Sequence, residues 1–159
     1  MTIEIIKGDL LEGFARGEVD IIGHVVNCQS KMNSGIAKTI REKYPQVYDR
    51  YMMMSSRSSP EGLLGYAQFI YTDMEPDKGV YNLFAQLHYG YDGKKYLNYG
   101  ALGSCLNEVK DFLHNNGLLS VGFPYNMGSD RAGGDWDIVL EMIDFYFKNR
   151  NVKIYKLSQ

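Results

Sequence analysis

Residues 118–136, LLSVGFPYNMGSDRAGGDW, carry the pattern that decides the fold. The stretch starts with an apolar run from Leu118 to Phe123, between a glycine and a proline, and such a run is typical of a fully buried strand. Small residues follow, and a helix with one buried face is predicted to begin after Asp135. A strand, a glycine-rich loop and a helix N-terminus in that order can hold phosphate oxygens on backbone N–H groups. An ordinary strand-to-helix connection with Asp135 as the N-cap explains the stretch equally well.

A second strand, loop and helix of the same kind lies nearer the N-terminus. Residues 19–27, VDIIGHVVN, form a nearly continuous apolar run, as expected for a strand covered on both faces. The small polar loop 27–37 follows, and apolar residues then continue at helical spacing until Pro45 breaks or restarts the helix. Parallel neighbouring strands would bring both loops to the same edge of the sheet. Together the two loops favour a ligand with two phosphates.

His24 stands near the carboxyl end of the predicted strand 19–27. A histidine in a buried run is more often a hydrogen-bonded core residue than a catalyst. Its place at the ligand end of a strand favours a chemical role, because ligands of open α/β sheets sit outside the carboxyl ends of the strands. The sequence leaves both interpretations open.

The remaining segments alternate between strand and helix patterns. Further strands are predicted at residues 2–7, 65–72, 79–86 and 152–157, the last with one solvated face. A helical turn is predicted near Leu10, and a long amphipathic helix from Tyr99 to about Gly117. Residues 55–62, SSRSSPEG, are the most loop-like segment. Strands interleaved with helices predict an α/β layered fold with a mixed sheet, and the GxxxxGK[ST] and GxGxxG motifs are both missing from the sequence.

Composition limits the function classes. A chain of 159 residues with 45% hydrophobic and 23% charged residues is typical of one globular domain with a substantial core. A net charge of −2 gives no basic patch for nucleic acid. Cys28 and Cys105 lack CxxC spacing, so neither a zinc site nor a disulfide framework is indicated. With no run of 18 apolar residues and no signal peptide, we expect a cytoplasmic protein without membrane contact, metal or cofactor.

Four segments resemble the macrodomain family, the ADP-ribose-binding module. They are KGDL (7–10), HVVNCQSKMNSGIA (24–37), YNLFAQ (81–86) and MGSDRAGGDW (127–136) after a strand that ends in Pro124. The resemblance covers residues 1–159. It is strongest to the Appr-1-p processing branch with the yeast-type ADP-ribose-1″-phosphate phosphatase and the terminal ADP-ribose protein glycohydrolase. It implies one domain with three α/β/α layers and a mixed, mostly parallel central sheet.

The resemblance also implies roles for individual residues. Asp9, next to Leu10, is placed at the adenine amino group. The residues implied at the distal ribose and the adjacent phosphate are Asn27, Ser34, Gly35 and Ile36. Those implied around the diphosphate are Met127, Gly128, Ser129, Arg131, Ala132, Gly133 and Gly134. The phosphatase branch uses a histidine and an aspartate, which fall on His24 and Asp135, whereas Gln86 occupies the position of the glycohydrolase lysine.

Residues 129–131 depart from the small or apolar residues usual in the family. Asp130 and Arg131 could be a catalytic pair, a gate or a solvated loop tip, and Asp130 competes with Asp135 as the catalytic aspartate. Three function classes stay open. The favoured one is a phosphatase, a hydrolase that converts ADP-ribose-1″-phosphate to ADP-ribose and phosphate. The others are removal of ADP-ribose from a protein or nucleic acid, and ADP-ribose binding without turnover. The expected partners are therefore these small molecules and ADP-ribosylated macromolecules.

Overall fold

The computed structural model describes residues 3–33, 35–72, 78–90, 92–117 and 120–157. Its centre is a six-stranded sheet with the strand order β1-β6-β5-β2-β4-β3. The strands are β1 (Ile3–Lys7), β2 (Ile21–Asn27), β3 (Ala67–Tyr71), β4 (Gly79–Gln86), β5 (Ser120–Pro124) and β6 (Asn151–Lys156). Neighbouring strands pair in parallel except for β3, which runs antiparallel to β4. The predicted mixed, mostly parallel sheet is confirmed.

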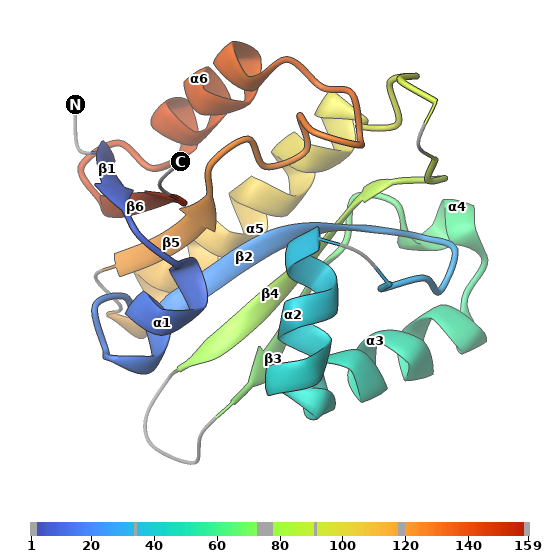
Figure 1. Ribbon diagram of the computed structural model, residues 1–159, viewed down its shortest axis with the longest axis horizontal. Helices are drawn as coiled ribbons and strands as arrows, with labels where there is room; N and C mark the ends of the chain where they lie inside the picture. The colour runs from blue at the N-terminus through green and yellow to red at the C-terminus, as the bar shows by residue number, and fades with distance from the viewer. Residues whose placement is uncertain (1–2, 34, 73–77, 91, 118–119, 158–159) are drawn as a thin grey trace.

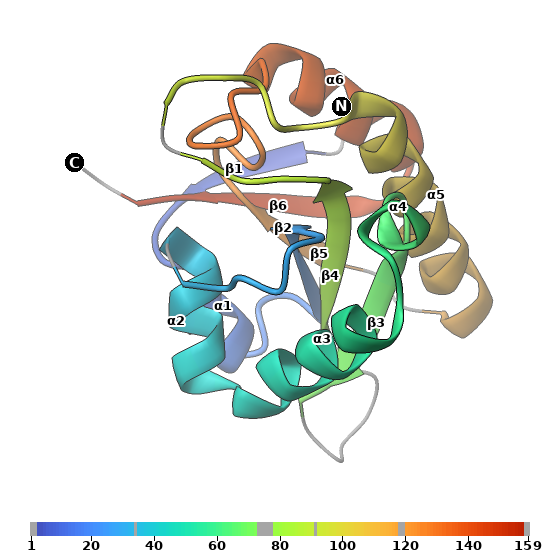
Figure 2. The same cartoon turned by 90° about the vertical axis from the view of Figure 1, so that its right-hand side faces the viewer.

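Helices cover both faces of this sheet. They are α1 (Leu10–Ala15), α2 (Gly35–Lys43), α3 (Pro45–Arg57), α4 (Pro60–Leu63), α5 (Tyr99–Asn116) and α6 (Trp136–Tyr146). Figure 1 and Figure 2 show α1, α2 and α3 on one side of the sheet and α5 and α6 on the other. Ile40 of α2 packs in a buried cluster on the first side, and Val109 of α5 and Ile143 of α6 pack in one on the second. The predicted three-layer α/β/α architecture is thus confirmed.

Local signals in the sequence set the ends of several helices. The side chain of Asn98 accepts a hydrogen bond from the backbone N–H of Ala101 and so caps α5. Gly117 ends α5 with φ 66°, a left-handed conformation that glycine adopts at little cost. Pro45 begins α3 directly after α2, because a proline lacks the N–H that a helix interior needs but its first turn does not.

Two predicted segments differ from the structure. The prediction of one solvated face for residues 152–157 was wrong, since β6 lies between β1 and β5 and buries side chains on both faces of the sheet. Val152 and Tyr155 pack in the cores on opposite faces of the sheet, and the Lys153 ammonium donates a hydrogen bond to the Glu18 carbonyl, 3.0 Å away. Lys153, between the apolar residues Val152 and Ile154, therefore gives the sequence the appearance of a strand with one solvated face.

The segment predicted as loop, residues 55–62, is largely helical. It contains the end of α3 and the start of α4, whose first turn begins at Pro60. The hydroxyl of Ser59 accepts a hydrogen bond from the backbone N–H of Gly62, 3.1 Å away. Serine before proline acts here as a helix N-cap followed by the favoured first-turn residue, and both signals were interpreted as loop signals.

The strand order places the ends of distant segments side by side. β2 pairs in parallel with both β5 and β4, and β6 pairs in parallel with β1 and β5. The carboxyl ends of these five strands therefore lie along one edge of the sheet, where the loops after β2 and β5 emerge next to each other. Within the described ranges, every helix is too short or too polar to cross a lipid bilayer.

Candidate functional site

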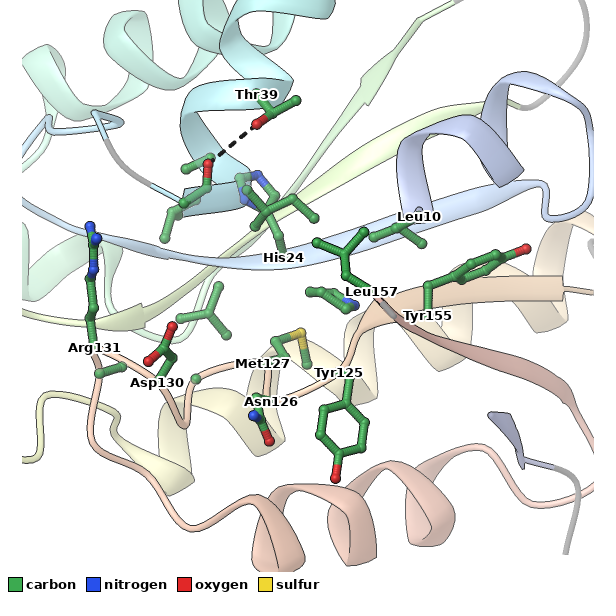
Figure 3. Close-up of a pocket in the computed structure, with 18 of the residues that line it drawn as sticks. Leu10, His24, Thr39, Tyr125, Asn126, Met127, Asp130, Arg131, Tyr155 and Leu157 are labelled. Atoms are coloured by element: carbon green, nitrogen blue, oxygen red, sulfur yellow. Dashed lines mark hydrogen bonds between the residues drawn. The ribbon is translucent and has the colours of Figure 1, made fainter. Parts of the chain in front are cut away.

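A cleft with a volume of about 1070 Å³ opens at the carboxyl edge of the sheet. Residues at the ends of β1, β2, β4, β5 and β6 line it, together with the N-terminal part of α2. Figure 3 shows Leu10, Tyr155 and Leu157 toward one end of the cleft and Asp130 and Arg131 toward the other. The cleft is therefore elongated and extends from the start of α1 to the loop after β5, with charged residues toward both ends, such as Asp9 beside Leu10, Lys156 beside Leu157, and Asp130 with Arg131. A site outside the carboxyl ends of parallel strands is the usual place for a ligand in α/β sheets.

Cations outnumber carboxylates among the charged side chains that line the cleft. The cations are Lys7, Lys31, Arg131 and Lys156, and the carboxylates are Asp9 and Asp130. The whole chain has a formal net charge of −2, so the cleft is more positive than the protein as a whole. A concave surface with excess positive charge concentrates anions and favours a ligand that carries about two negative charges.

Asp9 lies where β1 passes into α1 and lines the cleft. Its Oδ1 accepts a hydrogen bond from the backbone N–H of Glu12, 3.0 Å away, and so caps the helix. A carboxylate has acceptor capacity on both oxygens, which leaves Asp9 able to accept from a ligand donor as well. Leu10, which is buried, lies beside it on the same cleft wall.

Asn27 organises the loop that follows β2. Its Oδ1 accepts a hydrogen bond from the backbone N–H of Gln29 (3.0 Å), and its Nδ2 donates to the Lys31 carbonyl (2.8 Å). The buried hydroxyl of Tyr51 lies 2.8 Å from the Asn27 carbonyl and accepts from the backbone N–H of Lys31 at 3.1 Å. Asn27 lines the cleft, as do Gly35 and Ile36 after it, but its side chain is engaged within its own loop.

His24 is both buried and part of the cleft lining. Its Nε2 lies 2.6 Å from Oδ1 of Asn82. Burial lowers the pKa of the imidazole to about 4, although the hydrogen bond to Asn82 acts in the opposite direction. The side chain is therefore neutral at pH 7. The sequence left open whether His24 is a hydrogen-bonded core residue or a residue of the site. In the structure it is a hydrogen-bonded core residue that also forms part of the cleft floor.

The loop between β5 and α6 contributes buried residues to the cleft and packs closely against another part of the chain. Met127 and Ala132 are buried and line the cleft. Gly133, with φ 71°, approaches another part of the chain, since a Cβ built there would lie 2.5 Å from the carbonyl oxygen of Lys94. A Cβ at Gly134 would lie 2.5 Å from a methyl group of Leu97. These two glycines allow the loop to pack against residues 94–97, a role that the sequence did not suggest.

Asp130 and Asp135, the two competing aspartates, occupy different environments. Asp130 lines the cleft, next to Arg131. Asp135 is exposed and caps α6, because its Oδ1 accepts a hydrogen bond from the backbone N–H of Asp137 at 2.9 Å. The structure therefore places Asp130 in the lining of the same cleft as His24, and it places Asp135 outside that lining.

Most of the residues predicted for the site converge. Those that line the cleft are Asp9, Leu10, His24, Asn27, Gly35, Ile36, Met127, Gly128, Asp130, Arg131 and Ala132. The predicted residues that are described but lie outside the lining are Ser129, Gly133, Gly134 and Asp135. Ser34 lies outside the described residues. Whether the converging residues contact a ligand stays a prediction.

Sequence reasoning missed three lysines of the cleft, namely Lys7, Lys31 and Lys156. Lys7 and Lys156 are register partners at the ends of the paired strands β1 and β6. Their common position follows from the insertion of β6 beside β1, which the sequence pattern does not reveal. Gln86 lines the cleft at the end of β4, and its Nε2 donates to the His88 carbonyl at 3.2 Å.

Comparison with known proteins gives the fold a name. No family model matches the sequence. The chain is 25% identical over 154 residues to an uncharacterized 17.5 kDa protein in the tk-vs intergenic region of Enterobacteria phage T4, which covers 97% of this chain and 96% of that one. A structure from Bacteroides thetaiotaomicron, of a protein of unknown function, matches with a TM-score of 0.84 and 27% identity over 99% of both chains. The macrodomain of Mycobacterium tuberculosis DarG matches with a TM-score of 0.78 and 22% identity over 98% of this chain and 99% of that one. The chain has the macrodomain fold.

One further structure with this fold contains a ligand. Thermosipho africanus DarTG, solved in complex with ADP-ribose, matches with a TM-score of 0.77 and 18% identity. The match covers 98% of this chain and 42% of that one. At this level of identity the macrodomain structures establish the shared fold, and the ligand of this chain is argued from its own cleft.

Proposed function

We propose that this macrodomain-fold protein binds ADP-ribose in the cleft at the carboxyl edge of its sheet. The observation that carries the proposal is the cleft itself, which is elongated, combines apolar side chains with the Asp9 carboxylate at one end and is lined by more cations than carboxylates. ADP-ribose has a planar base at one end and a diphosphate with two negative charges in the middle. The shape and the charge of the cleft match both features.

The base fits the end of the cleft near Asp9. Leu10, Ile36 and Leu157 supply apolar surface there, and the carboxylate of Asp9 can accept a hydrogen bond from the exocyclic amino group of adenine. The diphosphate then lies toward the loops after β2 and β5, where Lys31 and backbone N–H groups can neutralise its charge.

Asp9→Asn tests this placement without removing the helix cap, because asparagine caps a helix about as well as aspartate. The variant loses a charged acceptor, and hydrogen bonds to charged groups contribute roughly 1.5–3 kcal/mol. We therefore expect ADP-ribose to bind between about 10-fold and 100-fold more weakly by isothermal titration calorimetry.

Glu12→Gln is the matched control, since Glu12 is an exposed carboxylate on the same helix that does not line the cleft. This control should bind as the wild type does. An inosine analogue of ADP-ribose, which lacks the amino group, should bind the wild type weakly and be little affected by Asp9→Asn. Absence of ADP-ribose binding by the wild type at millimolar concentration would overturn the proposal.

A second proposal concerns turnover of ADP-ribose-1″-phosphate. The observation that favours it is the position of Asp130 and Arg131 on the wall of the cleft. In this reaction a water oxygen bonds to phosphorus and the bond from phosphorus to the sugar oxygen breaks. The sugar oxygen leaves with the electron pair and takes up a proton, which gives ADP-ribose and inorganic phosphate. The Asp130 carboxylate can accept the proton of the attacking water, and Arg131 and Lys31 can neutralise the phosphate.

His24 is a poor proton donor for this step. It is neutral at pH 7, because burial lowers its pKa to about 4, and its Nε2 is engaged by Asn82. Asp135 caps α6 and does not line the cleft, so its carboxylate is also poorly placed to take part in the reaction. We therefore assign the proton transfer from water to Asp130 in place of the histidine and aspartate pair that the sequence resemblance implies.

Release of inorganic phosphate from ADP-ribose-1″-phosphate measures this activity. Asp130→Asn should lower the rate by about 100-fold or more, whereas Asp135→Asn should leave it within a few fold. The opposite ranking would show that Asp135 is the catalytic aspartate. Incubation with an ADP-ribosylated protein tests the glycohydrolase alternative, which Gln86 in place of a lysine disfavours. If neither substrate is turned over, the protein is a binding module.

A further inference from the structure

A row of buried polar side chains crosses three strands beneath α2 and α3. His24 of β2 is the register partner of Asn82 of β4, and Asn82 is the register partner of Gln68 of β3. The exposed fractions of their side chains are 0%, 0% and 7%. Burying polar groups is costly unless they are hydrogen-bonded, and each of these three side chains has a hydrogen-bond partner within the row. The proposed binding and turnover steps give Asn82 and Gln68 no role.

The hydrogen bonds in this row have a fixed direction. Nε2 of Gln68 donates to the Arg50 carbonyl of α3 at 2.9 Å, and a carbonyl can only accept. The Gln68 amide is thereby oriented with Oε1 toward Nδ2 of Asn82, 3.1 Å away. The Asn82 amide in turn presents Oδ1 to Nε2 of His24. Because Oδ1 is an acceptor, Nε2 of His24 must be the nitrogen that carries the proton.

The other ring nitrogen of His24 is left as an acceptor without a partner. A neutral imidazole has one protonated and one unprotonated nitrogen, so Nδ1 has a free lone pair. Nδ1 is buried, and no atom of the described residues lies in hydrogen-bonding position to it. His24 belongs to the cleft lining, and Figure 3 shows it between Leu10 and Thr39. An unsatisfied acceptor in this position calls for a donor that the described residues do not supply.

We propose that Nδ1 of His24 accepts a hydrogen bond from a neutral O–H or N–H group of the bound nucleotide, and that Asn82 and Gln68 are positioning residues that fix the His24 tautomer. The inference rests on the proposed binding of ADP-ribose in the cleft. An unprotonated nitrogen repels the lone pairs of phosphate oxygens. This part of the floor therefore selects the nucleoside portion of the ligand, through its amino group or a ribose hydroxyl, and disfavours a phosphate.

Nitrogen NMR of protein labelled with ¹⁵N-histidine tests the tautomer directly in the free protein. At pH 7 we expect His24 to show a protonated Nε2 and an unprotonated Nδ1. A protonated Nδ1 in the wild type overturns the proposal. This measurement needs no ligand, so its outcome is independent of whether ADP-ribose binds.

Gln68→Met tests the positioning role. Methionine nearly conserves the volume of glutamine but cannot donate to the Arg50 carbonyl, so the Asn82 amide becomes free to rotate and the His24 tautomers should become mixed. Gln46→Met is the matched control, because Nε2 of Gln46 also donates to a backbone carbonyl, that of Thr72 at 3.2 Å, outside this row. The control should keep the single wild-type tautomer. A folded Gln68→Met protein with that same single tautomer overturns the positioning role.

Titration with ADP-ribose tests the acceptor role. The Nδ1 signal of His24 should move in the direction that marks a new hydrogen bond, and His24→Phe should weaken binding about 3-fold to 10-fold in calorimetry. With the inosine analogue, a shift that persists identifies a ribose hydroxyl as the donor, and a shift that disappears identifies the amino group. An unchanged Nδ1 signal at saturating ADP-ribose overturns the acceptor role while the proposed function stands. If calorimetry detects no binding, the proposed function fails and the acceptor role fails with it.

Discussion

Acidification should destabilise the folded protein through His24, and the size of the effect follows from its burial. The side chain is fully buried, and its pKa lies at about 4 in place of the ordinary 6.5. Between pH 6.5 and pH 4, His24 therefore binds a proton in the unfolded chain but stays unprotonated in the folded protein. The free energy of unfolding consequently falls as the pH is lowered toward 4. The complete difference is on the order of 3 kcal/mol, and most of it is already lost at pH 4.5.

Urea unfolding at pH 7 and pH 4.5 measures this contribution when the wild type is compared with His24→Gln. Other groups titrate over the same range, but they contribute equally to both proteins and cancel in the comparison. The wild type should lose roughly 2–3 kcal/mol more than His24→Gln between the two pH values. His88→Gln supplies the control, because His88 is exposed, and this variant should show the pH dependence of the wild type.

Equal losses in the wild type and in His24→Gln would refute the reasoning. That result would mean that the folded protein accepts a proton on His24 as readily as the unfolded chain does. The neutral tautomer inferred from Asn82 and Gln68 would then also be lost in the acidic part of the range.

The remaining predictions concern the two cleft-side loops. Gly133→Ala should lower the free energy of unfolding by about 1–3 kcal/mol, because φ is 71° and the new Cβ would lie 2.5 Å from the Lys94 carbonyl oxygen. Gly35→Ala should cost less stability, since φ is 60° but, its chain neighbours aside, no atom of the described residues lies within 4 Å of the new Cβ. It should nevertheless weaken ADP-ribose binding, because Gly35 lines the cleft. Thermal unfolding and calorimetry of the two variants separate these effects, and equal binding by Gly35→Ala and the wild type would place the phosphates elsewhere.

Much of the fold could be predicted because its signals are local. The strand predicted at residues 79–86 coincides with β4, which is buried on both faces and is apolar at most of its positions. The helix predicted from Tyr99 to about Gly117 matches α5, because a capping asparagine and a left-handed glycine mark its two ends. The convergence of the loops after β2 and β5 also followed from the sequence, since parallel strands bring their carboxyl ends to one edge.

The composition of the cleft could be predicted only in part. The residues quoted for the family resemblance include Asp9, Asn27 and Asp130, and all three line the cleft. Lys156 was missed, because the alternating pattern of residues 152–157 contains no sign that the strand is inserted between β1 and β5. The choice between the two aspartates was likewise open, since a local pattern shows a helix cap but not the direction in which a loop faces.

The amino-acid sequence is sufficient to predict the layered α/β class, most of the strands and helices, and the two loops that meet at the cleft. Periodicity and caps encode these features within a few neighbouring residues. Only the tertiary structure decided the protonation of His24, because the hydrogen bonds that fix it join residues 24, 82, 68 and 50 on four different elements. Strand pairing and burial create that row, and neither can be predicted from the residues that neighbour His24 in the sequence. The electrostatic character of the cleft floor is therefore a property of the folded chain.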